Sequence, residues 1–176
     1  MEGDKTSYKN VSEQFAEALF YVWQETRRLT YDFVNTIPYD ILIQKLPRPG
    51  LDTFAKHLRE MALVQEAYID VLEGKSLDFS KVEGITFGKE DYVPASKDEI
   101  INLLKNADNR FLEVFRKVRN WNEEVEIFGT KLPKYIILEL MIRHETFHQG
   151  QFVIFCYILK VKPPQSWIEE WALPWW

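Results

Sequence analysis

The sequence has few of the features that mark secreted or membrane proteins. Cys156 is the only cysteine among 176 residues, so the chain can form no internal disulfide, which agrees with a reducing compartment. No apolar run reaches the roughly 20 residues that a membrane-spanning helix requires, and the first ten residues, MEGDKTSYKN, are too polar for a signal peptide. We therefore expect a cytoplasmic protein that does not enter the membrane.

Positive charge is also scarce. The chain has 22 Lys and Arg against 27 Asp and Glu, a formal net charge of −5. Without a dense basic stripe, such a chain has no long-range attraction for phosphate backbones, so we expect no nucleic-acid partner. The sequence is 46% hydrophobic and 15% aromatic, and it contains no repeats or low-complexity tracts. This composition is typical of one globular domain over residues 1–176.

Apolar residues recur at helical spacing in four segments, and no segment shows the sustained alternation of a sheet protein. The spacing predicts helices over 12–36, 54–74, 96–118 and 133–159, the first and third capped by Ser12 and Ser96. The predicted fold class is therefore all-α. The connection from Gly74 to Ala95 is long enough to span a bundle, which favours parallel second and third helices. The short VEIF at 125–128 is interpreted as part of a loop.

The predicted fourth helix is apolar at both ends, but its middle reads RHETFHQGQ. Polar groups inside a buried helix are costly unless they have a partner, and a metal ion would supply one. His144 and His148 lie four residues apart and so share one helical face. His57 lies on the inward side of the second helix. Because bundle cores build metal sites from facing helices, the three histidines of the chain predict a metal site with open positions for water.

The stretch from His144 to His148 also matches H-E-x-x-H, in which two histidines bind zinc and the glutamate, here Glu145, is the general base of a metalloprotease. The extended motif needs Gly and His where this chain has Gln151 and Ile154. The protease interpretation is therefore less favoured.

A downstream glutamate ligand for such a protease would have to be Glu169 or Glu170, beyond Pro163 and Pro164. No predicted sheet offers an edge for a peptide substrate. A histidine pair that forms only hydrogen bonds is the other alternative to a metal site.

Two stretches resemble the DinB/YfiT-like family of metal-dependent enzymes. They are IPYDILIQKLPRPGLDTFAKHL at 37–58 and RHETFHQGQF at 143–152, the second followed by Pro163, Pro164 and Trp167. Many members read His-Arg-Gly-Gln where this chain has HQGQ at 148–151, so this chain lacks that arginine. The resemblance covers nearly the whole chain through the order and spacing of these motifs.

The resemblance implies a four-helix bundle in up-down-down-up order. It also implies a divalent metal, zinc or nickel, on His57, His144 and His148, and a homodimer. Relatives include transferases and isomerases that use low-molecular-weight thiols, and others resemble hydrolases. We expect a metal-dependent enzyme acting on a small molecule, with thiol-dependent S-transfer ahead of hydrolysis. A metal-binding or dimerising helical protein without catalysis is the alternative.

Three further features complete the expectations. Glu145 is interpreted as a base for a metal-bound water or as a residue that orients a histidine, although it could equally pair with Arg143 on the surface. Cys156 lies about 12 Å along the helix from His148 and is interpreted as a core residue. The tail carries four tryptophans in ten residues, for which docking on the chain's own bundle is the simplest interpretation and a dimer interface the second.

Overall fold

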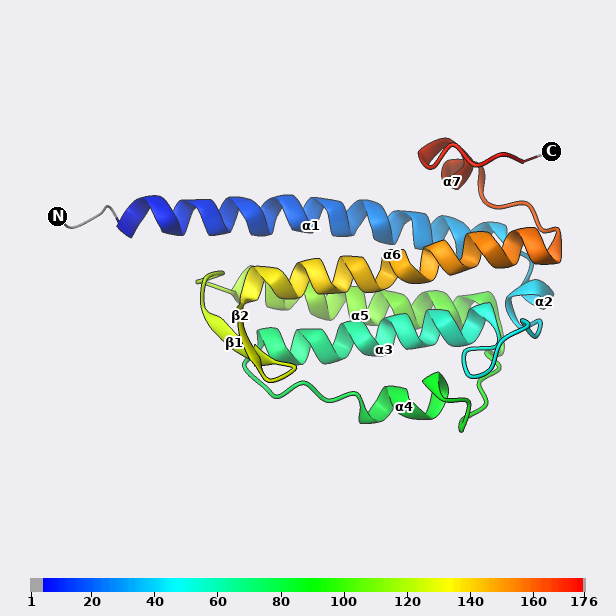
Figure 1. Ribbon diagram of the computed structural model, residues 1–176, viewed down its shortest axis with the longest axis horizontal. Helices are drawn as coiled ribbons and strands as arrows, with labels where there is room; N and C mark the ends of the chain where they lie inside the picture. Colours follow the sequence, from blue (N-terminus) through cyan, green and yellow to red (C-terminus); the bar gives the residue numbers. More distant parts are fainter. Residues whose placement is uncertain (1–4, 176) are drawn as a thin grey trace.

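The computed structural model describes the backbone of residues 5–175 and the side chains of residues 11–175. The elements in chain order are α1 (Lys5–Thr36), α2 (Tyr39–Leu42), α3 (Phe54–Leu72), α4 (Ser80–Thr86), α5 (Lys97–Lys117), β1 (Glu124–Ile127), β2 (Thr130–Pro133), α6 (Lys134–Leu159) and α7 (Gln165–Glu170). The long helices α1, α3, α5 and α6 form the bundle, and α4 lies along its side (Figure 1). No helix in this part of the chain is long and apolar enough to cross a membrane.

The topology is the up-down-down-up order expected from the sequence. Helices α3 and α5 run in the same direction, opposite to α1 and α6 (Figure 1). The connection between α3 and α5 returns along the bundle and contains the short helix α4, which packs on α3. The all-α fold class and the parallel second and third helices are therefore confirmed.

Seven of the eight predicted helix ends lie within two residues of the ends in the structure. The Ser96 side chain accepts a hydrogen bond from the backbone N–H of Glu99, as predicted for an N-cap. Helix α3 ends two residues before Gly74, and α6 follows directly after Pro133. The predicted start at Ser12 is wrong, because α1 begins at Lys5 and Ser12 lies buried inside the helix.

The interpretation of residues 125–128 as a loop is also wrong. Residues Glu124–Ile127 pair antiparallel with Thr130–Pro133, with Ile127 opposite Thr130. Phe128 and Gly129 have φ values of 51° and 71°, the positive values that a two-residue hairpin turn requires. This hairpin caps one end of the bundle and leaves the all-α class unchanged (Figure 1).

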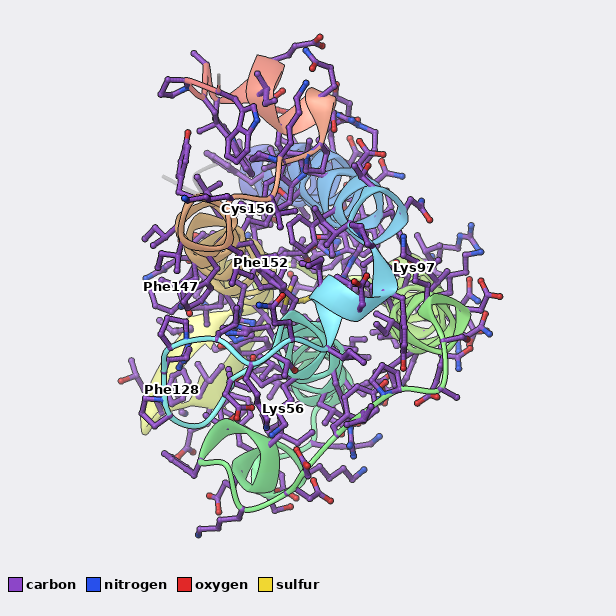
Figure 2. All side chains as sticks on the ribbon, turned by 90° about the vertical axis from the view of Figure 1, so that its right-hand side faces the viewer. Lys56, Lys97, Phe128, Phe147, Phe152 and Cys156 are labelled. Atoms are coloured by element: carbon purple, nitrogen blue, oxygen red, sulfur yellow. The ribbon has the colours of Figure 1, made fainter. Side chains whose placement is uncertain are left out.

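The aromatic tail docks on the bundle of its own chain. Trp167 is fully buried, and its indole N–H donates a hydrogen bond of 2.8 Å to the backbone carbonyl of Leu29. Its ring lies 4.9 Å from that of Phe33, which is also fully buried. Phe152 lies inside the bundle, whereas Phe128 and Phe147 lie on its outside (Figure 2). Trp176, which the sequence groups with this tail, lies outside the described residues.

Candidate metal centre

His144 and His148 lie one turn apart on α6 and face α3. Their Nε2 atoms are 3.1 Å apart. His148 is buried, and the His144 side chain keeps 23% of its surface exposed. Because residues at i and i+4 share a helical face, the HETFH stretch brings both rings to one point, as the sequence predicts.

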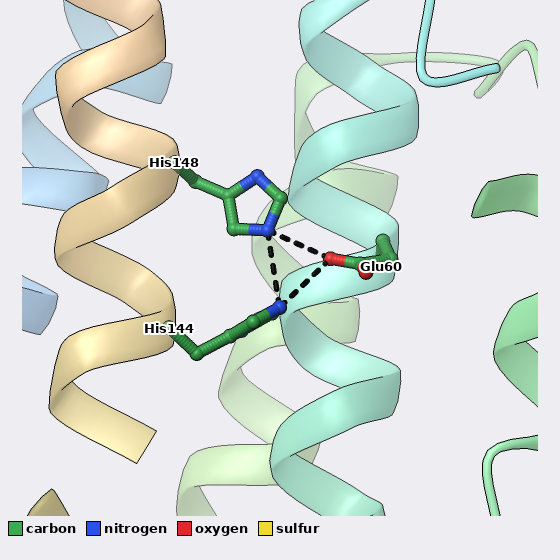
Figure 3. Close-up of side chains that lie close together, drawn as sticks. All are labelled: Glu60, His144 and His148. Atoms are coloured by element: carbon green, nitrogen blue, oxygen red, sulfur yellow. Dashed lines mark hydrogen bonds and ion pairs between the residues drawn. The ribbon is translucent and has the colours of Figure 1, made fainter. Parts of the chain in front are cut away.

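Glu60 of α3 completes this group (Figure 3). Its Oε2 lies 2.8 Å from Nε2 of His148 and 3.2 Å from Nε2 of His144. The Oε1 atom accepts a hydrogen bond of 3.4 Å from the hydroxyl of Thr86, at the end of α4. Two elements therefore fix the carboxylate, and α4 contributes directly to the site.

The group formed by Glu60, His144 and His148 could hold a metal ion, since one ligand atom from each lies within 4.8 Å of the others. Zinc–nitrogen bonds of about 2.0–2.1 Å put the ligands of a tetrahedral ion about 3.3 Å apart, close to the distances here. Glu60 Oε2 is buried, and the two ring nitrogens lie within ion-pair distance of it. A cation between these atoms would satisfy all three, so the residues fit a metal.

The protonation states also favour cation binding. Burial lowers the pKa of His148. Burial, together with the neighbouring His148 and Arg48, lowers the pKa of His57 to about 3. Burial alone would raise the pKa of Glu60, but its contacts with His144 and His148 bring it below the usual value. Neutral imidazoles and an ionised carboxylate are the forms that bind a metal.

His57 joins the cluster from the other side of the His148 ring. It is fully buried, and its Nδ1 lies 2.8 Å from Nδ1 of His148, whereas His144 and Glu60 face Nε2 of that ring. The Nε2 atom of His57 lies 3.4 Å from Nη1 of Arg48, which also donates a hydrogen bond to Gln151. The structure thus brings the three predicted histidines together, but the ligand atoms that converge include Glu60 and not His57.

Glu60 escaped the sequence analysis although a signal was present. It follows His57 by three residues, so the two side chains share one face of α3. Histidine and glutamate at this spacing recur in metal sites of helical bundles, usually with the glutamate first. The reversed order makes this signal weaker than the spacing of His144 and His148, and the family resemblance implies histidine ligands alone.

The carboxylate of Glu145 lies on a different face of α6 and contacts α1. Its Oε1 accepts a hydrogen bond of 2.5 Å from the Thr30 hydroxyl, and its Oε2 lies 3.2 Å from Nη2 of Arg27. Burial raises the pKa of Glu145, against the attraction of Arg27. One residue turns an α-helix by about 100°, so a neighbour of His144 cannot share its face. The structure therefore directs Glu145 into the bundle and away from both Arg143 and Glu60.

Arg27 is the centre of a buried polar layer that joins all four long helices. Its Nε lies 3.2 Å from Oδ1 of Asp108 on α5, and its Nη2 donates a hydrogen bond to Gln65 on α3. Gln149 of α6 donates a hydrogen bond of 2.8 Å to the backbone carbonyl of Thr26. This layer lies between two hydrophobic clusters, one around Phe33 and Phe152 and the other around Trp23 and Phe111.

Cys156 takes no part in the site. It is fully buried, and burial raises the pKa of its thiol to about 12. The thiolate is the nucleophilic form of cysteine, and at neutral pH it is nearly absent here. The interpretation of Cys156 as a core residue agrees with this placement.

The comparisons with known proteins agree with the fold. The chain is a helical bundle with a buried Glu/His/His group able to hold a metal ion. The DinB family profile matches residues 9–165, and the chain belongs to the DinB family. A crystal structure of a DinB-like protein from Bacillus cereus is similar, with a TM-score of 0.65 and 20% identity over 84% of this chain and 95% of that one. No curated protein matches.

Proposed function

We propose that this protein is a metal-dependent enzyme that acts on a small molecule. His144 and His148 hold a divalent ion, zinc or nickel. Either Glu60 or His57 supplies the third ligand. The observation that carries the proposal is the convergence of two ring nitrogens on the buried Oε2 of Glu60.

A divalent ion in this group would supply Lewis acidity and would lower the pKa of a bound thiol or water. The protein's own residues do the positioning. Glu60 and His148 are buried and held from two helices, whereas His144 remains partly exposed and so lies where a substrate enters. Thr86 keeps the Glu60 carboxylate turned toward the histidines.

We favour thiol-dependent S-transfer over hydrolysis as the reaction, because the family resemblance points to low-molecular-weight thiols. A metal-binding protein without catalysis is the alternative. For the less favoured zinc protease, Glu145 would act as base. Its contacts with Thr30 and Arg27 support a role inside the bundle instead.

The metal site is tested by elemental analysis and zinc titration of protein without an affinity tag. We expect about one divalent ion per chain, as one group of ligands predicts. His144→Ala and His148→Ala should each abolish binding. Glu60→Gln and His57→Gln separate the two candidate third ligands, and Glu113→Gln, an exposed residue of α5, is the control. Retention of the ion in both histidine-to-alanine variants would contradict the proposal.

Turnover assays distinguish an enzyme from a metal-binding protein without catalysis. The zinc and nickel forms are assayed with thiol and electrophile pairs and with simple esters and amides. S-transfer that requires His144 and His148 supports the favoured reaction. Metal binding without turnover in either assay supports the non-catalytic alternative.

We also propose that the protein is a homodimer, as the family resemblance implies. Support comes from exposed apolar side chains on α1 and α6, among them Val22 at 44% and Phe147 at 65% exposure. Both border a groove between these helices. Sedimentation velocity should give a dimer that Phe147→Glu dissociates, with Phe128→Glu, at 66% exposure on the hairpin, as the matched control. A monomeric wild-type protein at micromolar concentration would refute the dimer.

A further inference from the structure

A cavity of about 360 Å³ opens between α3, α4 and α6, beside the candidate metal centre. This volume lies within the range of small-molecule sites. The cavity is lined by Glu60, Val64, Tyr68, Phe79, Val82, Glu83, Thr86, Phe87 and His144. It therefore leads directly to two of the residues that form the metal centre.

Apolar and aromatic side chains make most of the cavity wall. Val64, Tyr68 and Val82 are buried, and the ring of Tyr68 lies edge-on to Phe79 with centroids 6.0 Å apart. Phe87 lies at the mouth with 68% of its surface exposed. Large apolar side chains in a concave site favour a ligand with an apolar body of its own.

The Tyr68 hydroxyl is the one neutral polar group of the wall with no hydrogen bond to any residue that the structure describes. Tyr68 is only 6% exposed. The hydroxyl of Thr86, in contrast, already donates to Glu60. A hydroxyl in the wall without a protein partner can donate a hydrogen bond to an acceptor on a ligand.

The charged groups of the wall are all carboxylates apart from the imidazole of His144. Glu60 lies at the inner end and Glu83 at the exposed rim. None of the nine lining residues is Lys or Arg. Arg143, whose charge acts on Tyr68, is already paired with Glu139. Carboxylates on the body of a ligand would therefore meet like charges, and no Lys or Arg of the wall compensates them.

We propose that this cavity binds the apolar, uncharged body of a small molecule whose metal-binding head reaches His144 and Glu60. A thiol with an aromatic or aliphatic body fits this description, and a thiol carrying several carboxylates does not. The part of the proposal that concerns the head group depends on the proposed function. The part that concerns the body depends only on the cavity.

Three probes separate these parts in full-length, zinc-loaded protein. Phenylmethanol has the apolar body without a thiol, phenylmethanethiol has both, and mercaptosuccinate has a thiol with two carboxylates. Dissociation constants are measured by ligand-observed NMR and calorimetry. We expect phenylmethanethiol to bind at least about ten-fold more tightly than mercaptosuccinate, because like charges at the cavity disfavour the dicarboxylate.

Variants locate the binding site. Val82→Trp fills the cavity and should weaken both phenylmethyl probes at least about ten-fold, since loss of apolar contacts has effects of this size. Ile158→Trp, at an exposed position near the other end of α6, is the control. Phe87→Ala removes an exposed part of the wall. Because Phe87 is exposed, this change should not destabilise the fold, and it should weaken the binding of the same probes. Glu83→Lys should lower the dissociation constant of mercaptosuccinate, whereas Glu113→Lys should leave that constant unchanged.

The outcomes separate the cavity from the metal centre. If Val82→Trp and Phe87→Ala leave phenylmethanol binding unchanged, or if mercaptosuccinate binds more tightly than phenylmethanethiol, the cavity proposal is overturned. If phenylmethanol binds in the cavity but the thiol adds no affinity in the zinc form, the proposed function fails. The cavity then stands as an apolar binding site whose ligand does not reach the zinc ion.

Discussion

Arg27 and Arg28 are neighbours in α1 with opposite surroundings. Arg27 is buried between Asp108 and Glu145, whereas Arg28 pairs with Glu25 and Asp32 on the surface. Removing one partner of a buried ion pair leaves uncompensated charge, whereas an exposed pair adds little. The two positions therefore test the buried polar layer within one helix.

Arg27→Met should lower the free energy of unfolding by about 3–5 kcal/mol, because two buried carboxylates lose their cation. Arg28→Met should lower it by about 1 kcal/mol or less. Urea denaturation followed by circular dichroism measures both. Equal effects of the two substitutions would show that the layer does not stabilise the bundle as described.

At the residue scale, the sequence predicted the positions of the histidines but not the direction of every side chain. His144 and His148 share a face because of their spacing, and this needs no tertiary information. The direction of Glu145 depends on Arg27, which is far away in sequence and pairs with it only after folding. Glu60 likewise meets the histidines only when α3 packs on α6.

At the scale of elements, two glycines set the position of α4. Gly50 and Gly88 both have positive φ, and a Cβ on Gly50 would lie 2.3 Å from the backbone oxygen of Thr86. The loop that carries Arg48 therefore packs closely against the end of α4. This contact keeps Thr86 beside Glu60.

Gly50→Ala should destabilise the protein by more than the roughly 1 kcal/mol expected for alanine at positive φ alone. Gly74 is the matched control, because it has a φ of +85° but nothing within 4 Å of an added Cβ. The difference between the two variants in thermal unfolding measures the contact between the loop and α4. If Gly74→Ala destabilises the protein as much as Gly50→Ala, the close approach of Gly50 to Thr86 does not contribute to stability.

Arg110 joins α5 to α3 through Glu66, Asp70 and Glu73. Contacts with Lys75 and Arg110 lower the pKa of Glu73, and they lower the pKa of Asp70 against the opposing effect of burial. A carboxylate whose pKa is lowered by folding stabilises the folded state above its unfolded pKa. That stabilisation is lost as the pH falls through the folded pKa.

Arg110→Gln should therefore lower stability by about 1 kcal/mol at pH 7, a modest effect because the groups are partly exposed. The difference from wild type should shrink as the pH falls below about 4 and vanish once the three carboxylates around Arg110 are protonated. Lys105→Gln, an exposed change in the same helix, is the control. Urea denaturation across this pH range measures the difference in the free energy of unfolding between the two proteins. A difference that grows toward low pH would contradict the stabilising role of the Arg110 ion pairs.

Elements with a clear apolar stripe could be predicted from the sequence, and elements without one could not. The stripes of α3 and α5 indicate their faces and approximate ends, and the apolar stretches of α6 indicate its extent. The first turns of α1 are polar, so their helical continuation from Lys5 left no such signal. Helix α4 and the hairpin are short and depend on packing against α3, which sequence periodicity does not report.

At the scale of the whole molecule, the polar layer and the candidate metal centre occupy the middle of the bundle, between two hydrophobic clusters. The clusters supply stability on both sides, which allows the centre to hold charged and polar groups. The long connection between α3 and α5 brings α4 to the side of the bundle where His144 and Glu60 meet the cavity. Topology thus places an apolar wall beside candidate metal ligands.

Anomalous diffraction at the zinc edge, from crystals of the zinc-loaded protein, tests the central claim most directly. We expect one strong peak per chain, about 2.0–2.2 Å from Nε2 of both His144 and His148, with either Glu60 or His57 as the third protein ligand. The absence of a peak between α3 and α6, or a peak that contacts neither histidine, would contradict the account.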